Sequence, residues 1–294
     1  MIRIRPELRD LSMVAEELRF EVNGQLMAAR AVGPADGRPV LALHGWLDNA
    51  ASFRALEPYL DSVRLVALDL AGHGFSMHRP DAMPYYIWDN VADVLSVADE
   101  LGWEQFHLLG HSMGAGIASL LAGTMPERIL SLVLLEGLAP LADEPDELPG
   151  KMALAIRRRQ SRGRSPRYYP DTEAAVQARM KGHFPVTEQA ARWLVERSIV
   201  HTPKGVRWRS DPALVLPSVL RLSEAQVRAF LCAVKAPALL VMGSEGIGTP
   251  LLDERAALVS GLRRLTLAGN HHLHLDESSA RAVADTINEF HRHL

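Results

Sequence analysis

The 294-residue sequence predicts an α/β fold with a doubly wound, mostly parallel sheet. Short apolar runs bounded by glycine or proline recur along the chain, and stretches with helical spacing separate them. Runs of this kind are typical of strands covered on both faces, as in parallel sheets. In such sheets, ligands bind beyond the carboxyl ends of the strands.

Six strands are expected before residue 138. Weak alternation around the turn pair Asn23-Gly24 indicates an opening hairpin over 18–31. Apolar runs predict the next strands at 39–45, 63–69, 106–109 and 129–135, and helical spacing predicts helices at 85–101 and 112–124. The pattern resumes later with strands at 237–242 and 262–267, and with helices at 250–259 and 276–290.

The alternation stops between residue 138 and about residue 222. This stretch contains helical patterns separated by prolines and no convincing strand. We therefore expect a helical cap, 138–222, inserted after the sixth strand into a core formed by 1–137 and 223–294.

Composition limits the classes of function. Hydrophobic residues make up 48% and charged residues 23%, as in ordinary globular proteins, and the net charge of −3 argues against a nucleic-acid partner. Cys232 is the only cysteine, so no intrachain disulfide can form. The first residues carry charges where a signal peptide needs an apolar stretch, and no run is long enough for a membrane span. We expect a cytoplasmic protein, with a homodimer left open.

A G-x-S-x-G motif stands between the strand predicted at 106–109 and the helix that follows it. This context indicates a nucleophile elbow, a sharp turn that strains its central residue and excludes side chains two positions to either side. Gly110 and Gly114 meet that steric demand, which makes Ser112 the candidate nucleophile. The Met113 amide, at the start of the helix, is a candidate donor to an oxyanion.

A serine hydroxyl needs a base to take its proton. Three histidines follow the last predicted strand, and we expect His271 to be the base, with His272 as the alternative and His274 packed or hydrogen-bonded within the loop. Zinc is the rival interpretation of this cluster. It is disfavoured because histidines so close on one loop cannot easily share an ion and no carboxylate stands at helical metal spacing beside them. We therefore predict no metal and no cofactor.

The base needs a carboxylate to orient it, and two candidates follow different strands. Glu136 ends the strand after the nucleophile helix, and Glu245 follows the next strand. The more uniformly apolar strand favours Glu136, because a buried charge there is costly without a partner. The second oxyanion donor is expected from the loop at Gly45, with the Trp46 amide opposite Met113.

His44-Gly45-Trp46, the segment from Asp69 to Ser76, the Gly110–Gly114 motif and the late His271 stand in the order seen in the α/β-hydrolase superfamily. Over nearly its whole length the chain resembles the capped, serine-nucleophile members, such as serine hydrolase-like proteins and carboxylesterases. The resemblance implies the α/β-hydrolase fold, a supporting role for Asp69 and Ser76, and a cap at 138–222.

The resemblance also bears on the acid and on the reaction. Most members place the acid after the strand corresponding to 238–242, where this chain has Gly246. A minority, including serine hydrolase-like proteins, place it after the preceding strand, which favours Glu136. Haloalkane dehalogenases and epoxide hydrolases attack with aspartate, so Ser112 argues against both activities.

These residues predict a hydrolase that cleaves carboxylic or thioesters of small molecules through an acyl-enzyme, with a Ser112-His271-Glu136 triad. The alternatives are a carbon-carbon bond hydrolase or a cofactor-free perhydrolase with the same triad, and a non-catalytic ligand-binding homologue. The cap contributes five aromatic side chains, at Tyr168, Tyr169, Phe184, Trp193 and Trp208, and a basic run over 157–167. In one interpretation, the aromatic side chains line an acyl pocket and the basic run forms its positive rim. In the interpretation that we favour, the aromatic side chains attach the cap to the core and the basic run faces solvent.

Overall fold

A computed structural model describes residues 15–81, 83–161, 167–248 and 251–294. The charged opening segment and part of the basic run, 162–166, lie outside the described residues. Within the described part, no helix is long and apolar enough to cross a membrane.

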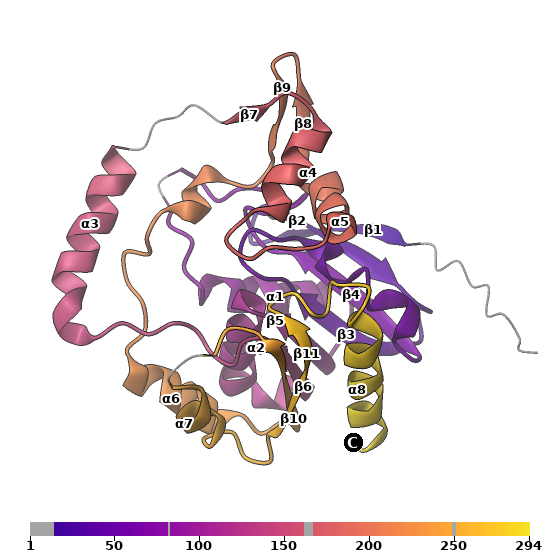
Figure 1. Cartoon of the computed structure of the whole chain (residues 1–294). Coiled ribbons are helices and arrows are strands. Elements are labelled where there is room, and N and C mark those ends of the chain that lie inside the picture. The colour runs from indigo at the N-terminus through magenta and orange to yellow at the C-terminus, as the bar shows by residue number, and fades with distance from the viewer. Residues whose placement is uncertain (1–14, 82, 162–166, 249–250) are drawn as a thin grey trace, which may run out of the picture.

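An eight-stranded, mostly parallel sheet forms the centre of the molecule (Figure 1). Its strands, in spatial order, are β1 (Glu16–Val22), β2 (Gln25–Val32), β4 (Val63–Asp69), β3 (Arg38–Leu43), β5 (Phe106–His111), β6 (Ile129–Leu135), β10 (Ala238–Glu245) and β11 (Arg263–Asn270). The β1–β2 and β2–β4 pairs are antiparallel, and the remaining pairs are parallel. The predicted fold class is confirmed.

The opening hairpin forms at the predicted turn. Asn23 and Gly24 both have positive φ, at 51° and 73°, as the two central residues of a type I′ turn require. The inner strands are buried on both faces, and every residue of β5 is buried. This explains why their sequences are apolar without alternation.

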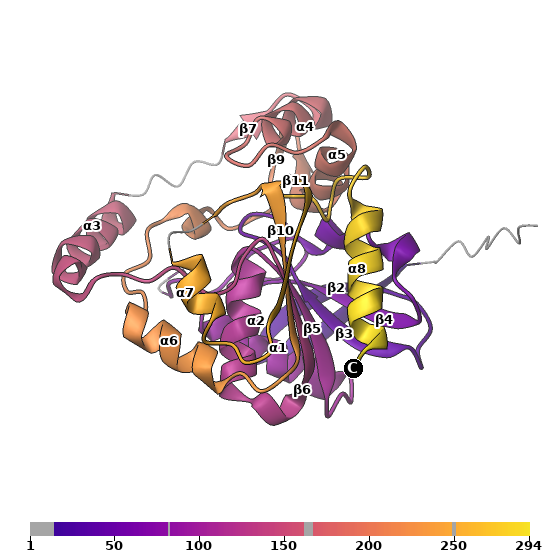
Figure 2. The same cartoon turned by 60° about the horizontal axis from the view of Figure 1, so that its bottom comes forward.

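Helices cover both faces of the sheet (Figure 2). One face packs against α1 (Asp89–Glu100), α2 (Met113–Thr124), α6 (Glu224–Ala233) and α7 (Leu252–Ala256). The other packs against α8 (Ala280–Arg292) and the 3₁₀ turn η1 (Ala50–Phe53). The helix expected from residue 85 begins at Asp89. Tyr85 lies before it, and its hydroxyl accepts from the Arg79 amide at 2.9 Å and donates to Asp211 at 2.8 Å.

The inserted segment, 138–222, contains α3 (Leu148–Gln160), α4 (Thr172–Met180) and α5 (Glu188–Ser198). It also contains β7 (Tyr168–Tyr169), β8 (Ile199–Thr202) and β9 (Gly205–Trp208), which form a small antiparallel sheet in the order β7-β9-β8. The expectation of a segment without strands is therefore wrong. Pro203 separates no helices here, because it stands in the short turn that joins β8 to β9, where Gly205 has a φ of 107°.

Most of the inserted segment stands over the carboxyl ends of the central strands. There α4, α5 and the small sheet lie above β10 and β11, whereas α3 stands apart to one side (Figures 1 and 2). Helices α4 and α5 pack against β8 and β9 through a small apolar core that includes Leu275 of the main domain. The inserted segment thus covers the edge of the sheet where ligands bind in such folds.

Candidate active site

Ser112 occupies a strained turn between β5 and α2, with φ 51° and ψ −112°. A Cβ atom on Gly110 would lie 2.6 Å from the Ala115 Cα, and one on Gly114 would lie 2.0 Å from the Leu43 carbonyl oxygen. Both approaches are far too close for a side chain. The turn therefore requires glycine at both positions, as the sequence predicts.

The three predicted triad residues meet in a hydrogen-bonded row. His271 Nε2 lies 3.1 Å from the Ser112 hydroxyl, and Nδ1 lies 3.0 Å from Glu136 Oε2. They come from three segments, after β5, β11 and β6, whose carboxyl ends lie at the same edge of the sheet. A proton on Nδ1, donated to the carboxylate, leaves Nε2 free to accept the serine proton.

Glu136, and not Glu245, provides the carboxylate of this row. Its side chain is completely buried, and the Gly243 and Ile247 amides donate to it, the latter at 2.8 Å. Glu245 is exposed at the end of β10. A Cβ atom on Gly246 would lie 2.0 Å from Glu136 Oε1, so the glutamate fills the space that a side chain at position 246 would need.

The two other loop histidines have different partners. His272 Nε2 lies 3.1 Å from Asp48 Oδ2, and His274 Nε2 lies 3.0 Å from the Ser52 hydroxyl. His274 is fully buried and packs against Phe53 and His111, which agrees with the expectation of a packed residue. Its hydrogen bond goes to η1 and not to its own loop. His271 is the loop histidine that contacts Ser112.

The loop at Trp46 is held by two neutral histidines. His44 Nε2 accepts from the Leu70 amide at 3.0 Å, and His73 Nε2 accepts from the Leu47 amide at 3.2 Å. Burial lowers the pKa of His44 to about 3 and that of His73 to about 4, so both rings can accept these bonds at neutral pH. His44 thus supports the loop.

Both predicted oxyanion donors lie at suitable places. Trp46 lines a pocket together with Ser112, and Met113 is the first residue of α2. A backbone amide in the first helical turn has no acceptor within the helix. Their role as oxyanion donors stays a prediction.

Asp48 is a buried charge that sequence reasoning missed. Its Oδ1 accepts from Arg179 of α4 at 2.8 Å. Burial raises the pKa of the Asp48 carboxyl, but Arg179 and His272 outweigh this effect and hold that pKa well below its usual range. His111, which was also missed, bonds through Nε2 to the His271 carbonyl oxygen at 2.9 Å. Two features of the sequence could have indicated these residues: Asp48 is a carboxylate two residues after Trp46, and His111 lies inside the G-x-S-x-G motif.

The supporting role of the segment from Asp69 to Ser76 is visible in its contacts. Asp69 accepts from the Ala50 and Phe75 amides at 2.8 and 2.7 Å and from Arg197 of α5 at 2.8 Å. The Ser76 hydroxyl donates to the Asp69 carbonyl oxygen at 2.6 Å. Through Asp69, this segment is hydrogen-bonded to η1 and to α5 of the inserted segment.

A cavity of about 210 Å³ opens beside Ser112 and His271. Three of the five aromatic side chains singled out in the inserted segment line it, namely Tyr169, Phe184 and Trp208. Trp193 instead stacks on Arg54, with 5.4 Å from the guanidinium carbon to the ring centre, and Tyr168 is exposed. The inserted segment therefore supplies pocket walls as well as attachment to the core.

Comparison with known proteins agrees with this architecture. Residues 38–277 match the family model of the α/β-hydrolase fold. The chain is 34% identical to a serine hydrolase-like protein of Dictyostelium discoideum, over 90% of this chain and 79% of the relative. It is 30% identical to a serine hydrolase-like protein of Danio rerio, over 94% and 88% of the two chains.

Two solved structures are similar along their whole length. A hypothetical protein of Pseudomonas aeruginosa PAO1 is 44% identical, with a TM-score of 0.90 over 94% of this chain and 99% of that one. A thioesterase domain from the curacin biosynthetic pathway is 26% identical, with a TM-score of 0.83 over 93% and 99%. The chain belongs to the α/β-hydrolase fold family and, within it, to the serine hydrolase-like proteins.

Proposed function

We propose that this protein is a serine hydrolase that cleaves carboxylic or thioesters of small molecules through an acyl-enzyme. The observation that carries the proposal is the row from Ser112 through His271 to Glu136, with distances of 3.1 and 3.0 Å. These are hydrogen-bond distances, at which a serine can lose its proton to an imidazole as it attacks.

In the first half-reaction, the Ser112 hydroxyl attacks the acyl carbon while His271 Nε2 takes its proton. The carbonyl oxygen becomes an oxyanion, which the Trp46 and Met113 amides stabilise, each by roughly 3 to 4 kcal/mol. When the intermediate collapses, the bond to the leaving group breaks and the imidazolium gives its proton to the departing alkoxide or thiolate. Glu136 stabilises the imidazolium and fixes its orientation.

In the second half-reaction, water replaces the leaving group. His271 removes a proton from the water as its oxygen attacks the acyl-enzyme, and a second oxyanion forms in the same place. Collapse of this intermediate breaks the bond to Ser112, and His271 returns the proton to the serine oxygen. The products are a carboxylic acid and the regenerated hydroxyl, so no cofactor takes part.

The size and lining of the pocket favour a short acyl group. A volume of about 210 Å³ is below the roughly 300 to 1,000 Å³ that is usual for sites of drug-sized ligands. Trp46, Tyr169, Phe184 and Trp208 give it mostly apolar walls. We further propose that the inserted segment, 138–222, is a cap that shapes this pocket over a core of 1–137 and 223–294. The similarity to a thioesterase domain supports including thioesters.

Hydrolysis of p-nitrophenyl acetate, butyrate and decanoate and of the matching acyl thioesters tests this proposal. We expect kcat/KM to be highest for the two short esters, and Ser112→Ala to lose on the order of 10⁴-fold or more in kcat. Ser210→Ala, which removes another pocket hydroxyl, is the matched control and should keep measurable turnover. Turnover that survives Ser112→Ala would contradict the proposed nucleophile. Absence of hydrolysis of every ester and thioester by the wild type would contradict the proposed reaction.

A further inference from the structure

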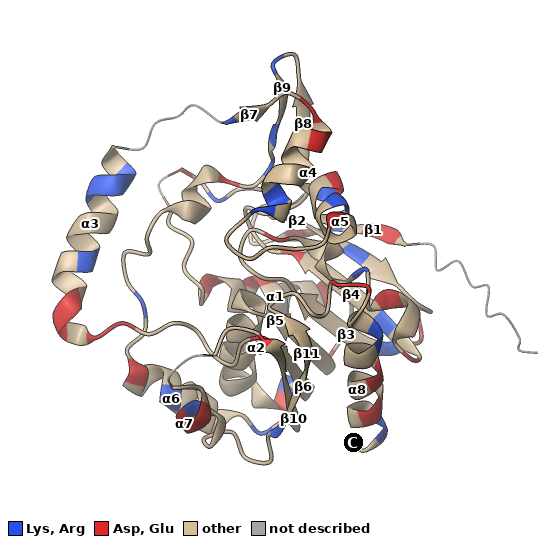
Figure 3. Cartoon of the chain, in the orientation of Figure 1, with Lys and Arg blue, Asp and Glu red and all other residues tan. Residues whose placement is uncertain are grey.

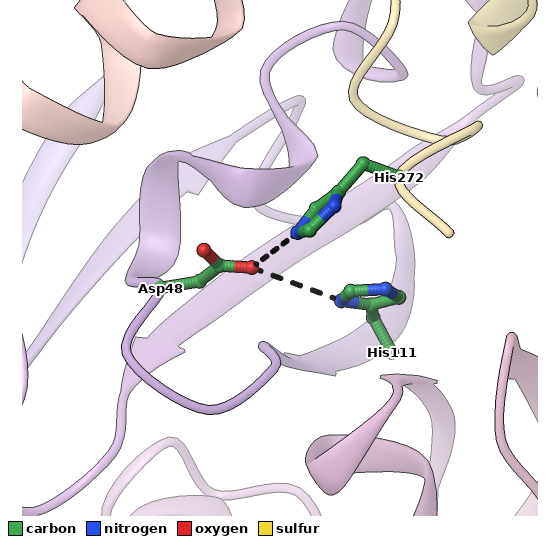
Figure 4. Close-up of side chains that lie close together, drawn as sticks. All are labelled: Asp48, His111 and His272. Carbon is green, nitrogen blue, oxygen red and sulfur yellow. Dashed lines mark hydrogen bonds and ion pairs between the residues drawn. The ribbon is translucent and has the colours of Figure 1, made fainter. Parts of the chain in front are cut away.

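Asp48, His111 and His272 converge next to the proposed triad (Figure 4). Asp48 follows β3, His111 ends β5 directly before Ser112, and His272 follows the proposed base. One side-chain oxygen or nitrogen from each lies within 4.8 Å of the others. Asp48 Oδ2 is 3.1 Å from His272 Nε2 and 3.9 Å from His111 Nδ1.

The protonation of His111 makes this cluster unusual. Its Nε2 bonds to a carbonyl oxygen, which can only accept, so Nε2 carries the proton of the neutral ring. Nδ1 then carries a lone pair that faces the Asp48 carboxylate. The side chain is 1% exposed, and Nδ1 has no hydrogen-bond partner among the described residues. Two acceptors that face each other repel unless a cation or a donor lies between them.

The cluster can be reached from the pocket. Asp48, His111 and His272 all line the cavity beside Ser112, together with Gly45. A Cβ atom on Gly45 would lie 2.8 Å from His111 Nδ1 and 3.3 Å from Asp48 Oδ2. The glycine therefore keeps the space beside the two acceptor atoms open.

The donor atoms suit a transition metal. An ion with ligands at 2.0 to 2.2 Å in a tetrahedron holds them about 3.4 Å apart, and the two distances from Asp48 Oδ2, 3.1 and 3.9 Å, bracket that value. Two imidazoles and a carboxylate bind Zn²⁺ and its neighbours in preference to Mg²⁺ or Ca²⁺. His272 Nδ1 has no partner in the described part of the chain, so it can carry the ring proton when Nε2 binds the metal.

Arg179 limits the affinity of such a site. Its guanidinium donates to Asp48 Oδ1 and also lies 3.3 Å from His272 Nε2, so part of the negative charge is already balanced. Asp48 Oδ2, in contrast, faces the two histidines. A metal ion must bind against the repulsion of Arg179 or move it aside, which fits a reversible inhibitor better than a permanent cofactor.

Although the loop histidines alone predict no metal, we propose that His272 forms, with Asp48 and His111 from two other segments, an inhibitory site for a divalent transition metal ion of the Zn²⁺ type. The ion occupies the pocket wall beside Ser112, draws His272 and the adjoining His271 toward it, and displaces Arg179 from its place in the wall. The inhibition rests on the proposed hydrolase function. The binding of the metal does not.

Metal binding to the full chain is measured by calorimetry with Zn²⁺ and by the visible absorption of Co²⁺, with Mg²⁺ as the comparison ion. We expect one Zn²⁺ per chain and a tetrahedral or five-coordinate Co²⁺ spectrum, without competition from Mg²⁺. His272→Gln should weaken binding at least tenfold, whereas His183→Gln, which alters another pocket histidine, should leave it unchanged. Asp48→Asn should also weaken Zn²⁺ binding, because it removes the charge of the proposed carboxylate ligand.

Arg179→Gln distinguishes a metal site from general damage to the pocket. Removal of the competing cation should tighten Zn²⁺ binding at least severalfold, in the direction opposite to the other variants. Equal affinity in the wild type, His272→Gln and Asp48→Asn would overturn the proposal, as would weaker binding by Arg179→Gln. If the wild type binds Zn²⁺ in this pattern but cleaves no ester, the metal site stands and the proposed function fails. If it cleaves esters but binds no Zn²⁺, the proposed function stands and the metal site fails.

Discussion

At the scale of the residue, the position of Glu136, the proposed triad carboxylate, is the most informative feature of this site. β6 and β10 are neighbouring parallel strands, with Leu135 paired to Val241, so the loops that follow them lie side by side. A glutamate at the end of β6 can therefore reach the amides of the loop after β10 and the imidazole of His271. Gly246 leaves the space that this carboxylate occupies.

Glu136→Gln should reduce kcat for a short p-nitrophenyl ester at least about a hundredfold, because an amide does not stabilise an imidazolium. The amide also has only one acceptor oxygen, whereas Glu136 accepts on Oε1 from Gly243 and on Oε2 from Ile247 and His271. Glu245→Gln is the control, since that side chain is exposed, and it should have little effect on kcat. Steady-state kinetics on the three proteins measures this difference. A loss confined to Glu245→Gln would contradict the assignment.

The same assignment predicts a rescue. Glu136→Gly removes the carboxylate and opens the space at position 246, so adding Gly246→Asp should restore part of the lost kcat. Gly246→Asp alone should lower stability, because its Cβ would lie 2.0 Å from Glu136 Oε1. No recovery of activity in a folded double variant would show that a carboxylate from the loop after β10 cannot take the place of Glu136.

At the scale of the element, the turn at Ser112 depends on close packing between α2 and the sheet. Nearly all of α2 is buried, and its first turn lies directly against the end of β3. This packing explains the run of small residues after Ser112. The glycines of α2 therefore differ from a glycine in an exposed helix, where a side chain meets no neighbouring element.

Gly114→Ala and Gly150→Ala should change stability in opposite directions. A Cβ atom on Gly114 would lie 2.0 Å from the Leu43 carbonyl oxygen, and forcing it in should cost about 1 to 3 kcal/mol or more. Among the described residues, and apart from the backbone of α3 itself, no atom lies within 4 Å of a Cβ atom on Gly150, so alanine should stabilise that helix by up to about 1 kcal/mol. Urea unfolding monitored by circular dichroism gives both values. A change of the same sign in both variants would argue against this packing.

Local patterns explain how much of the fold is predictable from sequence. The predicted strands, the turn at Asn23-Gly24 and the strained turn at Ser112 depend on neighbouring residues, and the structure has all of them. The β8–β9 hairpin was missed because Pro203 also suits a break between helices. The pair of Asp48 with Arg179 was missed because 131 residues separate the two, and no local pattern indicates such a contact.

At the scale of the whole molecule, many histidines are buried in neutral form. His107 of β5 and His291 of α8 share the Ser131 hydroxyl, at 2.7 and 3.2 Å. Burial lowers the pKa of His107 to about 4 and that of His291 to about 3. The folded state thus resists protonation at pH values where the unfolded chain takes up protons.

The stability of the molecule should consequently depend on pH. These pKa values are depressed in the folded state, so their contribution to stability is complete above the unfolded pKa of about 6.5 and is lost as the pH falls toward 4. The free energy of unfolding should fall by up to about 1.4 kcal/mol per pH unit for each histidine. Urea titrations between pH 7.5 and pH 4.5, a range chosen to span the histidine pKa of about 6.5, measure the slope. His291→Gln should make it shallower, and an unchanged slope would contradict this origin.

The central claim is that Ser112 is a nucleophile activated by His271. A fluorophosphonate bonds covalently to an activated serine, and mass spectrometry of the intact protein and its peptides locates the adduct. We expect one adduct per chain on the peptide that contains Ser112, no adduct in Ser112→Ala, and much slower labelling of His271→Gln. An unmodified wild-type protein, or an adduct that persists in Ser112→Ala, would contradict it.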